Sequence, residues 1–266
     1  MTAQENNAVY AQGDEMPTYL DIQAEVGITK HMGGYEATDE LYTLCHLDEA
    51  QEVLDVGCGI GVGPVYMAKQ YPCRVTAVDL SEKMLSWARK RAHREGVADR
   101  ITFRQADVRE LPFEDARFDA VIVESVLAFV ADKQATIQEL LRVIKPGGYL
   151  GLNESYWTHQ PPAEVLANSF WGNMDIATET EWRAIWEASG LEERTIQPRT
   201  LTAKQELRDR IQWIGWRSIL AAWGRTIALL LTHPGARDSI KDQLDAPPEL
   251  TSAMAYALFA GRKPKS

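Results

Sequence analysis

A short apolar run that passes directly into a glycine-rich turn constrains the fold more than any other segment of this 266-residue chain. Residues 52–56 (EVLDV) predict a buried strand, and glycines follow at alternate positions. Glycine tolerates positive φ and has no Cβ atom, so Gly57, Gly59 and Gly61 allow a flat ligand to lie against the backbone. The segment therefore predicts a nucleotide-binding turn at the end of a strand.

The spacing of these glycines separates the candidate nucleotides. A dinucleotide fingerprint needs glycines at relative positions 1, 3 and 6, whereas the sixth position here is valine or proline, depending on which glycine opens the count. What remains is an acid followed by alternating glycines, Asp55 to Gly61, and this resembles the first motif of class I S-adenosylmethionine (SAM) methyltransferases. The alternative is an ordinary glycine turn at the end of a strand.

A second apolar strand ends in Asp79, which lies 24 residues after Asp55. In doubly wound folds an acid about 20 residues beyond the glycine turn binds the ribose hydroxyls, so Asp79 is the candidate ribose ligand. Leu80 and Met84 follow it and are candidates for the same cofactor site. Asp79 also has a structural alternative, because either it or Ser81 is placed to cap the helix that follows.

Further strands are expected at 101–105, 118–124 and 149–153, and the run LRVIKPGG at 141–148 precedes the last of them. Over roughly residues 52–154 these segments resemble methyltransferases of the ubiquinone/menaquinone C-methyltransferase type. The resemblance implies an α/β fold with a doubly wound, seven-stranded Rossmann-like methyltransferase sheet. It also implies SAM as the cofactor and S-adenosylhomocysteine (SAH) as the product.

The same resemblance implies roles for three further residues. Asp107 would accept a hydrogen bond from the adenine amino group, with Val108 beside it, and Glu124 would lie beside the sulfonium. Alternating strands and helices dictate parallel strands whose carboxyl ends form the ligand site. Because Asp79, Asp107 and Glu124 all end strands or follow them directly, we expect them to share one site with the glycine turn.

Three parts of the chain are expected around this site. Residues 1–48 predict a helical cover over the cofactor, residues 49–200 and 250–266 the SAM-binding core, and residues 201–249 a helical insertion before the final strand. The insertion follows a strand that should run parallel to the others, so it emerges at the carboxyl end of the sheet. We therefore expect it to form a lid.

The insertion carries a predicted helix over 206–231 whose tryptophans Trp213, Trp216 and Trp223 fall on one face, with arginines on or near the opposite face. Three interpretations stay open. The face could pack on the core or in a homodimer, line an apolar substrate pocket together with Trp157, or contact a membrane surface. The arginines exclude a transmembrane span.

Candidate catalytic residues are those placed to remove a proton from the acceptor, which is needed only if the acceptor loses one. His31 and Tyr35 lie in the segment expected to cover the cofactor, where Thr38 is a further candidate. Glu154 and His159 follow the fifth strand. His31 has a structural alternative as a surface or capping residue, and His159 as a solvent-facing residue in a loop next to prolines.

The composition limits the classes of partner and metal that we expect the protein to bind. The formal net charge of −10 argues against nucleic acid, because non-specific binding of nucleic acid depends on phosphate neutralisation by Lys and Arg. The three cysteines form no Cys-x-x-Cys pair, so neither a disulfide framework nor a zinc site is indicated. We expect a reduced, cytoplasmic setting, no signal peptide and no metal.

The sequence therefore predicts a methyltransferase that acts on a small, apolar or aromatic acceptor at carbon, oxygen, nitrogen or sulfur. It leaves open a protein that binds SAM without transferring the methyl group, as a sensor or a non-catalytic partner subunit. It also leaves open an enzyme that transfers the aminopropyl group of SAM. Only methyl transfer predicts the formation of SAH once the correct acceptor is supplied.

Overall fold

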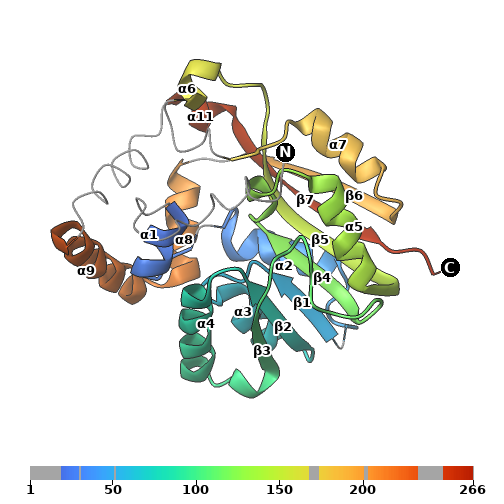
Figure 1. Ribbon diagram of the computed structural model, residues 1–266, viewed down its shortest axis with the longest axis horizontal. Coiled ribbons are helices and arrows are strands. Elements are labelled where there is room, and N and C mark those ends of the chain that lie inside the picture. Colours follow the sequence, from blue (N-terminus) through green and yellow to red (C-terminus); the bar gives the residue numbers. More distant parts are fainter. Residues whose placement is uncertain are drawn as a thin grey trace.

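A computed structural model describes residues 19–29, 31–50, 52–167, 174–200, 203–232 and 248–265. Within these ranges one seven-stranded sheet has the order β3-β2-β1-β4-β5-β7-β6 (Figure 1). The strands are β1 Glu52–Val56, β2 Arg74–Asp79, β3 Ile101–Gln105, β4 Phe118–Glu124, β5 Ile144–Trp157, β6 Glu192–Thr200 and β7 Met254–Arg262. Because β7 is antiparallel to both β5 and β6, β6 runs parallel to β5. The predicted doubly wound sheet is confirmed.

Helices cover both faces of this sheet (Figure 1). They are α1 Tyr19–Val26, α2 Gly34–Leu44, α3 Val62–Gln70, α4 Glu82–Glu95, α5 Lys133–Val143, α6 Ala163–Ala167, α7 Glu179–Glu187, α8 Ala203–Ile214, α9 Trp216–Thr232 and α11 Pro248–Ala253. Val53 joins the apolar cluster of α2, α3 and α4, whereas Leu54 joins that of α5 and α7. Successive strand residues face opposite sides, so one strand supplies both cores.

Local capping signals set both ends of α4, and the predicted cap at Ser81 is confirmed. At the N-terminus of α4 the Ser81 hydroxyl accepts a hydrogen bond from the Met84 N–H at 3.3 Å. Gly96, with φ of 73°, ends the same helix in the left-handed region. By contrast, the predicted start of the fifth strand is wrong: β5 begins at Ile144, because the chain already pairs with β4 there before a bulge.

The prediction of one continuous helix over 206–231 is also wrong. The chain forms α8 and α9, which are separated at Gly215, where φ is 87°. This conformation favours glycine and breaks the helical path, so the tryptophans do not share one face. Trp213 is buried at the end of α8, whereas Trp216 and Trp223 are exposed on α9.

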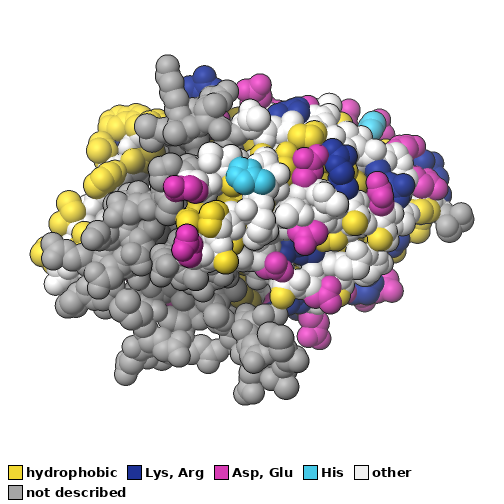
Figure 2. All heavy atoms as spheres, turned by 90° about the horizontal axis from the view of Figure 1, so that it is seen from above, with side chains coloured by type: hydrophobic (Ala, Val, Ile, Leu, Met, Phe, Trp, Pro, Cys, Tyr) yellow, Lys and Arg dark blue, Asp and Glu magenta, His cyan; other side chains and the backbone are white. Residues whose placement is uncertain are grey.

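The outward side of α9 is an exposed apolar surface, which we call the α9 stripe. Its members are more than half exposed: Trp216, Leu220, Trp223, Ile227 and Leu231. Figure 2 shows hydrophobic side chains gathered at the edge of the molecule where α9 lies in Figure 1. No helix within the described ranges is long and apolar enough to cross a bilayer.

Candidate functional site

The glycine turn is anchored to the neighbouring strand by its own backbone. The N–H groups of Gly57 and Cys58 both donate to the Val78 carbonyl, at 2.8 and 3.0 Å. All three predicted glycines have positive φ: 74° at Gly57, 51° at Gly59 and 77° at Gly61. A Cβ atom at Gly57 would lie 2.2 Å from a Val126 methyl group, and one at Gly61 would lie 2.7 Å from the Ala88 Cβ. The turn therefore requires glycine for both its conformation and its close packing.

Asp79 connects the end of β2 to the glycine turn. Its Oδ2 accepts a hydrogen bond from the Gly59 N–H at 2.8 Å, and its Oδ1 accepts one from the Ser81 N–H at 2.9 Å. Burial raises the pKa of Asp79, and the backbone donors oppose that rise. Each carboxylate oxygen retains a lone pair for a further donor. Leu80 beside it is 40% exposed, whereas Met84 is buried.

Asp55 lies on β1, buried on the sheet side of the turn. Its Oδ2 and the Tyr42 hydroxyl have no hydrogen-bond partner among the described residues. Both atoms border Gly63, at 3.7 and 3.6 Å from where its Cβ would be. Burial, then Glu124, then Asp79 raise the pKa of Asp55 well above its usual value. This cluster of carboxylates and an unsatisfied hydroxyl favours a bound cation.

A second polar cluster lies at the ends of β4 and β5. His31 Nε2 lies 2.6 Å from Thr38 Oγ1 and 3.1 Å from Glu124 Oε2. The Thr38 hydroxyl also reaches Glu124 Oε2 at 3.0 Å. The Asn153 side-chain amide donates to Glu124 Oε2 at 3.2 Å and to the Met32 carbonyl at 2.9 Å. Glu124 thus joins the sheet to the segment that covers it.

The hydrogen bonds of His31 determine which of its nitrogens carries a proton. Nδ1 lies 3.0 Å from the Met32 carbonyl, which can only accept, so Nδ1 must donate. Burial lowers the pKa of His31, and Glu124 partly offsets that effect. In the neutral ring, Nε2 accepts from the Thr38 hydroxyl. In the protonated ring, Nε2 donates to Glu124, and the Thr38 hydroxyl also donates to Glu124. Both ring nitrogens and the Thr38 hydroxyl therefore have acceptors in that state.

Aromatic rings from three elements pack above this cluster. Tyr35 of α2 lies 4.6 Å, centroid to centroid, from both Tyr66 of α3 and Trp213 of α8. Trp213 also meets the His31 ring edge-on at 4.1 Å. We call Tyr35, Tyr66 and Trp213 the aromatic cover. It places apolar surface directly beside the polar cluster around Glu124.

Other residues singled out in the sequence lie apart from this cluster. His159 is exposed and bonded only to the Thr158 hydroxyl among the described residues. Asp107 pairs with Arg109 at 2.6 Å, which holds the pKa of that carboxyl below its usual value. Val108, next to it, is buried among apolar residues under the sheet. Trp157 is buried in the core instead of facing the aromatic cover.

Glu154 is fully buried on β5, and its hydrogen bonds go to the loop after β4. Its Oε1 accepts hydrogen bonds from the N–H groups of Val126 and Leu127, at 2.8 and 2.9 Å. Its Oε2 has no hydrogen-bond partner in the part of the chain that the structure describes. Burial raises the pKa of Glu154 to about 7. These contacts hold the loop after β4 in place, and that loop packs against Gly57 through Val126.

Two members of the site were missed in the sequence. Asn153 lies opposite Glu124 in the register of β5 against β4, a pairing of neighbouring parallel strand ends. Tyr42 lies one helical turn after Thr38 on α2, so the helical period could have placed both on the buried face. No cluster of three metal-ligating side chains occurs among the described residues.

Comparisons with known proteins bear on this site. Residues 54–152 match the family described as a methyltransferase domain. The 27-O-demethylrifamycin SV methyltransferase of Amycolatopsis mediterranei is 33% identical over 160 residues, covering 58% of this chain and 59% of that protein. An uncharacterised methyltransferase of Bacillus subtilis is 34% identical over 181 residues, covering 66% of this chain and 76% of that protein.

Solved structures agree in fold. Haemonchus contortus phosphoethanolamine N-methyltransferase 2, bound to phosphomonomethylethanolamine and SAH, has a TM-score of 0.69 at 20% identity, covering 93% of this chain and 57% of that one. A SAM-dependent methyltransferase from Thiobacillus denitrificans, bound to SAH, has a TM-score of 0.66 at 21% identity, covering 92% of this chain and 98% of that one.

Proposed function

This chain belongs to the class I SAM-dependent methyltransferase family, and from that premise we propose that it methylates a small apolar or aromatic molecule beneath the aromatic cover. SAM is the methyl donor. The acceptor class is supported by the rings of Tyr35, Tyr66 and Trp213, because Trp213 meets the His31 ring of the polar cluster around Glu124 at 4.1 Å. Aromatic rings favour flat, apolar ligands.

The observation that carries the proposal is the buried acidic cluster around the glycine turn. SAM brings a sulfonium and an ammonium, which fit a place where burial, Glu124 and Asp79 all raise the pKa of Asp55. We assign the ammonium to Asp55 Oδ2 and the Tyr42 hydroxyl, two buried atoms that lack hydrogen-bond partners among the described residues and that both border Gly63. The sulfonium then belongs beside Glu124.

The remaining cofactor contacts follow from the position of each residue around the turn. We assign the ribose hydroxyls to Asp79 and the backbone contacts to Gly57, Gly59 and Gly61. The adenine ring is assigned to Leu80, Met84 and Val108, with its amino group donating to Asp107. The Asp107 carboxylate already pairs with Arg109 and keeps lone pairs for this contact.

Bound there, SAM supplies an electrophilic methyl group on a sulfonium whose charge is neutralised during transfer, so positioning provides much of the rate. His31, Thr38 and Tyr35 orient the acceptor and exclude water from it. Where the acceptor must lose a proton, His31 Nε2 receives it. The Thr38 hydroxyl then donates its hydrogen bond to Glu124 instead of to His31. The Glu124 carboxylate stabilises the resulting imidazolium.

The parts of the chain around the core have matching roles in this proposal. Residues 1–48 cover the cofactor and residues 201–249 form the lid over the acceptor, while 49–200 and 250–266 form the core. Residues 1–18, 30, 51, 168–173, 201–202, 233–247 and 266 of these parts lie outside the described ranges. Trp213 is the lid residue that faces the site, and we assign no acceptor contact to Trp216 or Trp223.

The proposal is tested by an acceptor screen with purified protein and SAM, in which SAH is quantified by mass spectrometry. Phenols, quinones and other small aromatic molecules are the first set, and short polyamines are the negative set. SAH that forms only with members of the first set, with a matching mass increase of the acceptor, supports the proposal. Tight SAM binding with no SAH from any acceptor would favour a sensor or partner subunit instead.

A further inference from the structure

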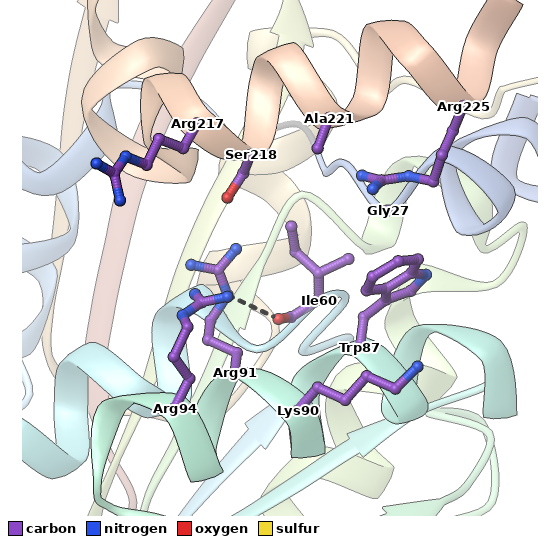
Figure 3. Close-up of a pocket in the computed structure, with 10 residues that line it drawn as sticks. All are labelled: Gly27, Ile60, Trp87, Lys90, Arg91, Arg94, Arg217, Ser218, Ala221 and Arg225. Atoms are coloured by element: carbon purple, nitrogen blue, oxygen red, sulfur yellow. Dashed lines mark hydrogen bonds between the residues drawn. The ribbon is translucent and has the colours of Figure 1, made fainter.

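A cavity of about 360 Å³ lies between α4 and α9, with Ile60 of the glycine turn at its edge (Figure 3). Trp87 and five basic side chains from two helices line this cavity. The basic residues are Lys90, Arg91, Arg94, Arg217 and Arg225. In Figure 3 the Arg91 and Arg94 side chains rise from α4 toward α9 across the cavity. We call this space the basic cavity.

The positive charge of the basic cavity is largely uncompensated. Among the described residues, one carboxylate, Glu95, forms an ion pair with any of the five cations of the cavity. Glu95 contacts Arg94 at 3.4 Å, but it also pairs with Lys69 at 2.7 Å, so Arg94 shares it with another cation. The Arg225 guanidinium instead donates to the Val26 carbonyl at 2.7 Å. Burial lowers the pKa of both Arg91 and Arg225, and Arg94 adds to the effect on Arg91.

This arrangement contrasts with the chain as a whole, whose formal net charge is −10. Five like charges around one small space repel one another unless an anion joins them. Arginine guanidinium groups bind phosphate oxygens in pairs, and here they approach from opposite walls. Trp87 and Ile60 add apolar surface to the same cavity. The space therefore suits an anionic group attached to a small organic part.

We propose that the basic cavity binds a phosphate-bearing ligand at a site separate from the cofactor turn. The two sites are adjacent, because Arg91 Nε donates to the carbonyl of Ile60, inside the glycine turn, at 3.1 Å. The phosphate could belong to a free organic phosphate or to a lipid headgroup. A lipid source would also use the α9 stripe, which lies on the outer side of the same helix.

The test compares three proteins: the wild type, the double variant Arg94→Gln/Arg217→Gln and the control Arg89→Gln/Arg183→Gln. Both double variants remove two arginines that are at least partly exposed, and Arg91 is kept because of its bond to the turn. Glycerol 3-phosphate is titrated calorimetrically at low salt in the presence of saturating SAH, which keeps the cofactor site filled. Vesicles of phosphatidylcholine, with and without phosphatidic acid, are tested by co-sedimentation.

We expect wild type and control to bind at least one phosphate probe, and the cavity variant to bind it about tenfold more weakly or worse. Binding of glycerol 3-phosphate identifies a soluble ligand, and binding to the phosphatidic acid vesicles alone identifies a lipid headgroup. The proposal is overturned if neither probe binds to folded wild type, or if the cavity variant binds as tightly as the control. Thermal unfolding of all three proteins verifies that they are folded.

Discussion

At the scale of single residues, Glu154 combines two backbone hydrogen bonds at one oxygen with an unpartnered, buried second oxygen. Burial outweighs the two donors and raises its pKa from 4.5 to about 7. A carboxyl group with this shift prefers the protonated state in the folded protein. Glu154 therefore makes the loop beside Gly57 sensitive to pH.

We predict that Glu154 makes the protein less stable as the pH rises. Its folded-state pKa lies above the unfolded value, so its contribution is fully present below about pH 4.5 and is lost as the pH rises through about 7. Relative to Glu154→Gln, the wild-type free energy of unfolding should fall by about 3 kcal/mol across this window. Urea denaturation of both proteins at several pH values measures this difference. If the free energies of unfolding of the two proteins depend on pH in the same way, Glu154 is not the group responsible.

His31 is the residue whose chemical role the cluster geometry supports, because it alone pairs a buried imidazole with Glu124 among the described residues. For an acceptor that loses a proton, His31→Gln should lower kcat by about 100-fold or more. The affinity for SAM should stay within about threefold, since no cofactor contact is assigned to it. The matched control is His93→Gln, an exposed histidine on α4. Equal kcat values for the two variants would exclude His31 as the base.

At the scale of elements, the break at Gly215 decides what the helical insertion can do. It lets α8 pack on α2 and bury Trp213 against His31 and Tyr35, while α9 turns its stripe outward. One insertion thus presents two surfaces with different roles. In the proposed function the inner one closes the acceptor site, and the outer one belongs to the helix that lines the basic cavity.

The two surfaces predict losses of stability of very different size for two tryptophan substitutions. Trp213→Ala removes a buried ring and should lower the free energy of unfolding by about 3 kcal/mol. Trp223→Ala removes a side chain that is 64% exposed and should change it by no more than about 0.5 kcal/mol. Chemical denaturation followed by circular dichroism measures both. Similar losses in the two variants would mean that α9 is packed more tightly than the exposure of Trp223 indicates.

At the scale of the whole molecule, the sheet could be predicted because its signals are local. The apolar strands, the glycine turn and the cap at Ser81 each lie within a few residues, and the alternation of strands and helices dictates parallel pairing with right-handed crossovers. The site depends on longer distances. Asn153 meets Glu124 only through strand register, and His31 meets Glu124 only because the Met32–Gly34 turn directs α2 over the sheet.

The insertion was harder to predict for a different reason. Residues 206–231 have a continuous helical pattern of apolar residues, which masks the effect of one glycine at 215. A glycine within a helix costs only about 1 kcal/mol, so packing of the flanking segments decides whether the helix breaks. Here the burial of Trp213 favours the break.

The central claim is that SAM binds at the glycine turn through Asp79. Calorimetric titration with SAM and SAH should give micromolar binding to the wild type and to the control Asp99→Ala, an exposed aspartate. Asp79→Ala should weaken binding by about 100-fold, since a charged hydrogen-bonding group is lost from the ribose. Unfolding midpoints of the three proteins show whether each is folded. No binding to folded wild type, or unchanged affinity in Asp79→Ala, would contradict the claim.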